Sequence, residues 1–157
     1  DLQMKQFVNS FNEGIILAVM SGNKRIIIHD IEPEQELQVI IPKEKEAVKS
    51  STGRLLLALQ TRDEQEMFIE KYGLPSKDIW PEIHTEKDFF TELDRIAQQR
   101  IASQTSLNHI IGIAVPILID NKPMASLGTY VPDVRLTPQL RKNMELQLKK
   151  IAKEISQ

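Results

Sequence analysis

The chain has 157 residues, of which 41% are hydrophobic and 27% are charged, and its formal net charge at pH 7 is −2. This composition predicts a globular domain with a sizeable core and excludes disordered chains. The longest uncharged apolar stretch, Ile110–Ile119, is far shorter than the roughly 20 residues that a membrane-spanning helix needs, and the N-terminus lacks a signal-peptide pattern. We therefore expect a cytoplasmic location and no membrane partner.

The counts of charged residues, cysteine and histidine exclude several chemistries. Twenty basic residues stand against 22 acidic ones, so nothing in the charge favours nucleic-acid binding by this chain itself. The lack of cysteine removes thiolate nucleophiles, disulfides and cysteine-ligated metals. His29, His84 and His109 lack metal-type spacing, and no GxSxG, P-loop or dinucleotide-binding motif is present. We predict no metal site, no cofactor and no catalytic activity.

The N-terminal part predicts one helix followed by strands. Apolar residues near a 3.6 period indicate an amphipathic helix over Leu2–Phe11. Three strand-like runs follow, of which the first two flank a turn at 21–23 and indicate antiparallel pairing. The runs are Gly14–Met20, Lys24–Ile31 and Leu37–Ile41. The charged stretch Pro42–Lys49 is interpreted as a loop, and Lys43–Lys49 within it as a solvated segment or a flexible lid.

Three helices are expected in the middle of the chain. The first begins near residue 52 or 53 and runs to about residue 60. Thr61 opens the second with a capping box, and Gly73 ends it. Thr85 caps the third, which carries a core-facing apolar stripe to about Arg100. Trp80, in the proline-containing loop between the last two, is expected to anchor that loop against the core, with a role in an interface as the alternative.

The C-terminal part predicts more strands and a final helix. A short strand is expected over Ile101–Ser106, and the long runs His109–Asp120 and Pro123–Val131 indicate a hairpin. Thr137 and Pro138 open a helix that ends near residue 156, with residue 146 or 148 on its apolar stripe. The element order predicts an α/β (α+β) fold with a central, mainly antiparallel sheet of about six strands flanked by helices.

The junction at 50–59 is the most informative segment for function. Three hydroxyl residues and Gly53 lead directly into an apolar, helix-forming run. The first N–H groups of a helix lack intrahelical partners and carry the positive end of its dipole, so they can hold a carboxylate or phosphate. Ordinary capping by Ser or Thr uses the same residues. Arg54, in the first turn, either pairs with such an anion or lies in solvent.

Four segments stand out for their order and spacing. They are STGRLLLA, the third helix with its trailing QQRIAS, IIGIAVPILIDNKPMASLGTYVP, and DVRLT before the last helix. Together they resemble the IclR family of bacterial transcription regulators. Gly53-Arg54, Ile113–Pro116 and Arg135–Thr137 stand at the places of the family's short motifs. The resemblance covers about Phe7 to Ile155.

The resemblance implies a single effector-binding domain of GAF-like fold over 1–157. Its helix at 1–12 would connect to an N-terminal winged helix-turn-helix domain that is absent here. In the family, a small metabolite, often a carboxylate, binds beside the sheet and biases the oligomer between DNA-binding states. We therefore expect a small-molecule effector, a homodimer or homotetramer, and contact with operator DNA only through the absent domain.

The family's pocket positions, carried over residue by residue, imply eight effector-binding residues. They are Ser51, Thr52, Gly53, Arg54, Gln104, Gly112, Gly128 and Tyr130. Gly128 and Tyr130 are two residues apart and so share a sheet face. Family members often carry an acidic residue near Gln104 and hydroxyls at the two last positions, so the effector is not taken from a relative. Tyr130 either fills the pocket or donates its hydroxyl to the ligand.

Two other functions remain open at this point. The chain could be a GAF-like module that only dimerises, with its pocket plugged by Tyr130 and other large side chains. A closed, apolar cavity would favour that alternative. It could also be a small hydrolase or transferase, which would need a Ser51 or Thr52 hydroxyl within hydrogen-bond reach of His109.

Overall fold

The fold is built on one curled antiparallel sheet, and the computed structural model describes residues 1–35 and 39–156. Six strands lie in the order β3-β2-β1-β6-β5-β4, and all five neighbouring pairs are antiparallel. The strands are β1 (Ile15–Ser21), β2 (Lys24–Ile31), β3 (Glu44–Glu46), β4 (Ala102–Thr105), β5 (Ile110–Ile119) and β6 (Lys122–Pro132). The predicted fold class is confirmed.

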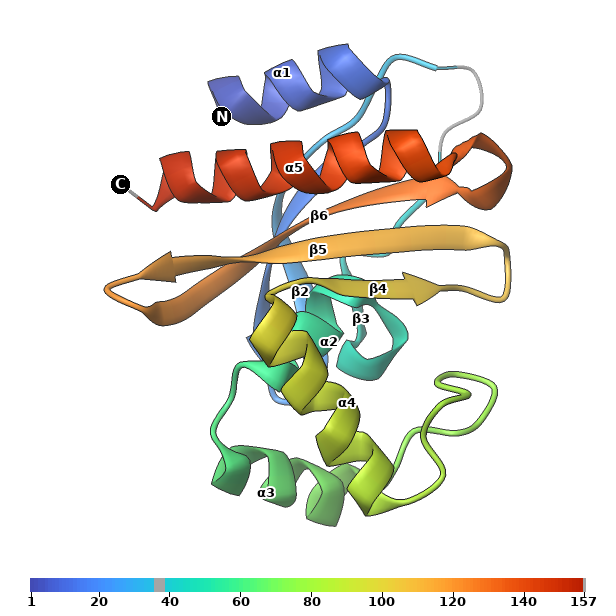
Figure 1. The fold of residues 1–157 in the computed structure, drawn as a ribbon, viewed down its shortest axis with the longest axis vertical. Coiled ribbons are helices and arrows are strands. Elements are labelled where there is room, and N and C mark those ends of the chain that lie inside the picture. The colour runs from blue at the N-terminus through green and yellow to red at the C-terminus, as the bar shows by residue number, and fades with distance from the viewer. Residues whose placement is uncertain (36–38, 157) are drawn as a thin grey trace.

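Helices cover both faces of this sheet. They are α1 (Leu2–Phe11), α2 (Ser51–Ala58), α3 (Arg62–Tyr72), α4 (Glu86–Gln99) and α5 (Pro138–Ile155), with 3-10 turns at Ala47–Lys49 and Asp133–Arg135. α1 and α5 lie side by side over one face, and α2 lies against the other with α4 and α3 beyond it (Figure 1). Within the described ranges, no helix is both long and apolar enough to cross a membrane.

Local capping explains where three of the helices begin. Thr61 and Thr85 each form a capping box with the residue three positions on, and Thr137 accepts a hydrogen bond from the Leu140 N–H. Pro138 occupies the first helical turn, where its missing N–H costs nothing. The three predicted helix starts are confirmed. They could be predicted because each contact joins residues that are only three apart in the sequence.

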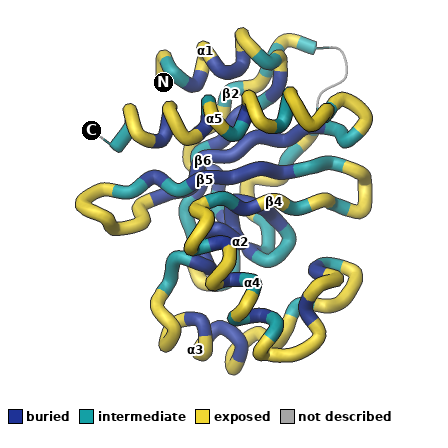
Figure 2. Tube along the Cα trace, in the orientation of Figure 1, coloured by how far each residue is buried: buried dark blue, intermediate teal, exposed yellow. Residues whose placement is uncertain are grey.

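Alternation along the strands places one apolar cluster on one face of the sheet and two on the other, and buried segments lie on both sides of the sheet (Figure 2). In β6, Leu127 packs into the core under α1 and α5, whereas Tyr130 belongs to the opposite face. The first core also takes Leu148 from α5, while Leu146 remains 60% exposed. Trp80 packs into a second core between α2 and α4, as predicted.

The third strand was predicted in the wrong place. Of Leu37–Ile41, the first two residues lie outside the described residues and the last three form no strand. Instead, β3 lies in the stretch expected to be a solvated loop, where Lys45 pairs with Arg25. Ala47 is buried there too. Backbone pairing with β2 forms this edge strand, so its charged side chains were no obstacle, and the apolar pattern at 37–41 was misleading.

Candidate functional site

The start of α2 lies directly on β5 and β6. Ser51 and Thr52 are fully buried. A Cβ added at Gly112 would lie 2.6 Å from Ser51 Oγ, and one added at Gly128 would lie 2.6 Å from Thr52 Cγ2. Both glycines are therefore required for α2 to approach this closely. The ring of Tyr130 is also near, 3.6 Å from the Cβ position of Gly112, so the structure brings five of the predicted residues together.

Ordinary helix capping accounts for some of the polar contacts of residues 50–53. Ser50 Oγ accepts a hydrogen bond from the Gly53 N–H at 3.0 Å, and Thr52 Oγ1 meets Ser50 Oγ at 3.5 Å. Gly53 itself lies against the Ala47 backbone, where a Cβ would clash. Ser51 Oγ is different, since it is buried and has no hydrogen-bond partner among the described residues. Ser50 is thus the cap, and Ser51 is left for another role.

Arg54 has a structural placement that differs from both roles considered for it. Its Nε donates to the Val48 carbonyl and its Nη2 to the Ile79 carbonyl, each at 2.7 Å. The guanidinium also lies 4.0 Å from the ring centroid of Trp80. Burial lowers the pKa of Arg54 to about 10, although neighbouring carboxylates oppose the shift. These two donors hold two loops to α2 and are therefore not available to a ligand.

Gln104 lies at the edge of the same sheet face. In register, it stands opposite Gly112, which in turn stands opposite Tyr130. Residues opposite one another in neighbouring strands point to the same face. The half-buried Gln104 side chain is therefore on the side that α2 covers, one strand beyond the cluster.

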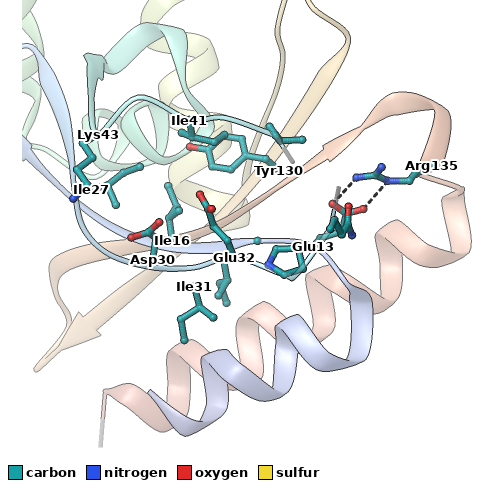
Figure 3. Close-up of a pocket in the computed structure, with 15 residues that line it drawn as sticks. Glu13, Ile16, Ile27, Asp30, Ile31, Glu32, Ile41, Lys43, Tyr130 and Arg135 are labelled. Carbon is teal, nitrogen blue, oxygen red and sulfur yellow. Dashed lines mark hydrogen bonds and ion pairs between the residues drawn. The ribbon is translucent and has the colours of Figure 1, made fainter. Parts of the chain in front are cut away.

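A cavity of about 140 Å³ lies beside Tyr130 (Figure 3). Its apolar wall comes from β1, β2 and the segment leading to β3. Charged side chains complete it. The main lining residues are Ile16, Ile27, Val39, Ile41, Glu13, Asp30, Glu32, Lys43, Tyr130 and Arg135. Tyr130 is the one predicted site residue that lines this cavity. Its charged walls differ from the apolar cavity that the dimerisation-only alternative predicts.

An ion pair closes one end of the cavity. Arg135 donates from Nε and Nη2 to the two carboxylate oxygens of Glu13, at 2.8 and 3.0 Å (Figure 3). Glu13 is 5% exposed and lies just after α1, whereas Arg135 lies in the turn between β6 and α5. The pair therefore links the first helix to the start of the last one. The sequence analysis did not identify Glu13.

Arg25 is the second site residue that sequence reasoning missed. It is fully buried in β2, and its Nη1 donates to the Pro42 carbonyl at 3.1 Å. In the described part of the chain, four buried side-chain atoms lack a hydrogen-bond partner: Arg25 Nε and Nη2, Ser51 Oγ and Tyr130 Oη. Its position two residues before Ile27 puts both side chains on one face, but Ile26, Ile27 and Ile28 are all apolar, so the sequence did not show that this face is the buried one.

The buried environment shifts the ionisation of two of these groups. Burial raises the pKa of Tyr130, and Arg25 and Thr52 oppose the rise without cancelling it. Burial also lowers the pKa of Arg25, against the opposing effect of Tyr130. Both shifts have the same cause, because removal of water disfavours a charged side chain.

The histidines do not form a nucleophilic site with the hydroxyls. His109 is exposed and pairs with Asp133 at 3.4 Å, whereas Ser51 Oγ has no partner and Thr52 Oγ1 meets Ser50. The geometry required by the hydrolase alternative is therefore not found. His29 is exposed, as predicted, and lies 2.7 Å from an Asp1 oxygen. No group of three acidic or histidine side chains that could hold a metal occurs within 1–35 and 39–156.

Solved structures with this fold come from several bacteria. The inducer-binding domain of PobR from Acinetobacter, a double mutant in complex with 3-hydroxybenzoic acid, matches with a TM-score of 0.86 and 23% identity, over 99% of this chain and 94% of that one. The C-terminal domain of Escherichia coli KdgR matches with a TM-score of 0.83 and 21% identity, over 99% and 93%.

A longer protein shares the fold as well. An IclR homologue from Microbacterium hydrocarbonoxydans in complex with 4-hydroxybenzoate matches with a TM-score of 0.82 and 18% identity, over 99% of this chain and 64% of that one. A comparison with curated protein sequences gives no significant match.

The family follows from the sequence profile described as bacterial transcriptional regulator IclR C-terminal, which matches residues 1–157. The profile covers the whole chain, and the structural matches agree with it in fold. The chain therefore belongs to the IclR family of bacterial transcriptional regulators and corresponds to their C-terminal domain.

Proposed function

We propose that this chain is the effector-sensing domain of a transcription regulator and that it binds a small, anionic metabolite where the first turn of α2 meets Tyr130. The observation that carries this proposal is the pair of buried hydroxyls, Ser51 and Tyr130, that have no hydrogen-bond partner in the described residues. Buried polar groups are normally paired, so these two favour a ligand site. Tyr130 lines the cavity, and Ser51 lies next to the Tyr130 ring at Gly112. The first-turn N–H groups of α2 add donors for an anion.

Ligands of two relatives and the size of the cavity support the same proposal. The PobR domain and the Microbacterium homologue bind 3-hydroxybenzoate and 4-hydroxybenzoate. The cavity here measures about 140 Å³, whereas pockets for drug-sized molecules span roughly 300–1,000 Å³. A small carboxylate is therefore the class of effector that we propose.

The cavity walls suggest how binding would act on the rest of a regulator. Glu13 follows α1 directly, and Arg135 precedes α5, so a ligand that alters their ion pair would alter how α1 sits on the sheet. A ligand shifts such an equilibrium only if it binds one arrangement more tightly than the other. α1 would pass the change to a winged helix-turn-helix domain, to the contacts between subunits and so to operator DNA.

A thermal-unfolding screen tests this proposal. The chain is heated alone and with small carboxylates, sugar acids and aromatic acids. Ligand at about 100 times its dissociation constant adds roughly 2.7 kcal/mol to the free energy of unfolding, which raises the midpoint by several degrees for a domain of this size. We expect a selective rise with one class of acid. A folded chain whose midpoint no acid changes would contradict the proposal.

A pair of threonine variants tests the position of the site. Thr52→Val keeps the shape of the side chain but removes its hydroxyl, and we expect it to abolish the ligand-induced rise in midpoint. Thr105→Val, at an exposed position in β4, is the control and should keep the full response. Equal responses of the two variants would place the ligand elsewhere.

A further inference from the structure

Arg25 is a charged side chain that the fold removes from water, with 0% of its surface exposed. It lies in β2, opposite Met20 of β1 and Lys45 of β3. Because Arg25 and Ile27 are two residues apart in the strand, both point to the face that α2 covers. A guanidinium in such surroundings is normally held by a carboxylate.

No carboxylate holds Arg25 in the described part of the chain. None of the ion pairs there includes it. Its one hydrogen bond is to the Pro42 carbonyl, and Nε and Nη2 have no acceptor. Lys45 is another nearby cation. Burial lowers the pKa of Lys45, and the charge of Arg25 lowers it further. Buried donors that lack acceptors lose hydration without compensation, so this arrangement favours an incoming anion.

The unpaired atoms of Arg25 belong to a group with two hydroxyls. Ser51 Oγ and Tyr130 Oη are the other buried side-chain atoms without partners among the described residues. Ser51 and the Tyr130 ring both lie against Gly112. Figure 3 shows the Tyr130 ring reaching from β6 towards Ile41. The next residue is Pro42, whose carbonyl accepts the hydrogen bond from Arg25. The cavity is lined by Tyr130, by Ile27 two residues from Arg25, and by Ile41 next to Pro42, so the donors of Arg25 and Ser51 lie behind this wall and do not themselves line it.

We propose that Arg25 is the residue that selects an effector carrying a carboxylate. Its Nε–H and Nη2–H form the edge of the guanidinium that matches two carboxylate oxygens. Arg135 uses the same two nitrogens for Glu13 in this structure. Ser51 and Tyr130 supply further hydrogen bonds, and the isoleucines that line the cavity contact the apolar body of the ligand.

This assignment rests on the proposed function and deepens it. Of the eight residues expected from the sequence, four lie at the start of α2 and the other four lie in β4, β5 and β6; none lies in β2. With Arg25, the charge of the effector is recognised by β2, and α2 supplies only orientation. Discrimination between a carboxylate and its uncharged amide should then depend on one side chain.

Arg25→Met tests the assignment, because methionine replaces the stem of arginine without its charge. The probes are matched acids and amides, namely benzoate and benzamide, 4-hydroxybenzoate and 4-hydroxybenzamide, propionate and propionamide, together with inorganic phosphate. Calorimetry measures their Kd values. We expect an acid to bind the unchanged chain in preference to its amide, and Arg25→Met to weaken that acid about tenfold or more while leaving the amide unaffected.

The unfolding midpoint of the ligand-free chain distinguishes this role of Arg25 from a structural one. A structural role would make Arg25→Met less stable. Removal of an uncompensated buried charge should leave the unfolding midpoint of the ligand-free Arg25→Met chain unchanged or raise it. Arg25→Lys, which keeps the charge but not the two-donor edge, should bind the acid with intermediate affinity. Arg62→Met is the matched control, since Arg62 is partly exposed and pairs with Asp94 at 2.6 Å. It should keep the preference for acid.

Each contrary result identifies what has failed. An acid-to-amide preference that survives in Arg25→Met, or a lower midpoint for that variant, overturns the role of Arg25. Equal binding of acids and amides to the unchanged chain overturns it together with the anionic class of effector, but leaves small-molecule sensing standing. Phosphate that binds as tightly as the acids overturns the selection of carboxylates. Failure of every probe to bind overturns the assignment and the proposed site together.

Discussion

Leu127 and Gly128 are neighbours in β6, but their side chains belong to different environments. Leu127 is fully buried in the core under α1 and α5. On the same face, Thr129 is the buried polar residue, and it donates to the Gly14 carbonyl at 2.7 Å. Gly128 faces Thr52 at the start of α2. That second face holds Arg25, Ser51 and Tyr130, whose buried polar atoms lack partners in the described chain.

The difference shows how one sheet can serve two purposes. Apolar contacts and satisfied hydrogen bonds make the first face a stabilising core. On the second face, glycines replace side chains so that a helix start can approach, and polar groups are buried without partners. Such an arrangement costs stability in the absence of a ligand, which is typical of functional sites. The following variants test whether the two faces differ in this way.

The largest effect is expected in the core under α1 and α5. Leu148 of α5 is fully buried, so Leu148→Ala should lower the free energy of unfolding by about 2–5 kcal/mol through lost contacts and a residual cavity. Urea unfolding followed by circular dichroism measures the change. Leu146, 60% exposed on the same helix, provides the control, and Leu146→Ala should change the value by less than about 0.5 kcal/mol. Similar losses in both would contradict the packing of α5.

A smaller loss is expected where α2 meets β6. Gly128→Ala would bring a Cβ to 2.6 Å from Thr52 Cγ2 and 3.1 Å from the Ile113 carbonyl oxygen. Such overpacking should cost about 1–3 kcal/mol. Thr52→Ser removes the crowded methyl group, so the double variant should recover part of the loss in a double-mutant cycle. Gly14→Ala, with its nearest atom at 3.5 Å, should cost less. Additive effects of the first two changes would argue against their contact.

Two isosteric threonine changes compare the polar groups of the faces directly. Thr129→Val leaves the Gly14 carbonyl without its donor and should cost about 1 kcal/mol. Thr52→Val should cost less, because the contact of Thr52 Oγ1 with Ser50 Oγ is long, at 3.5 Å. Chemical unfolding measures both. We expect the more destabilised variant, Thr129→Val, to keep its response to ligand. If Thr52→Val were the more destabilised variant, the polar groups of the second face would be as well hydrogen-bonded as those of the first.

The smallest effect concerns pH. Burial raises the pKa of Tyr130 above its ordinary value of about 10. As the pH rises past that value, the unfolded chain loses the tyrosine proton while the folded chain keeps it, so the free energy of unfolding falls, by at most about 1.4 kcal/mol per pH unit. Tyr130→Phe should flatten this alkaline slope and leave stability near neutral pH little changed. Unfolding curves recorded at several pH values test it, and parallel slopes would be the contrary result.

Much of the secondary structure could be predicted because its signals are local. The helix starts at Thr61, Thr85 and Thr137 depend on a hydroxyl and an N–H three residues apart. The hairpin of β5 and β6 follows from two apolar runs separated by a short turn. β3 was missed because an edge strand depends on backbone pairing with a distant partner, which no side-chain pattern reveals.

The sequence by itself therefore determined the order of elements, the fold class and the junction where α2 begins. Only the tertiary structure decided which polar side chains are buried and which residues surround them. In β2, Ile26, Ile27 and Ile28 are all apolar, so alternation alone could not show which face Arg25 shares. Arg54 likewise looked free until the loop around Trp80 folded over it. Burial depends on segments far apart in the chain, and that is what the local pattern of residues leaves open.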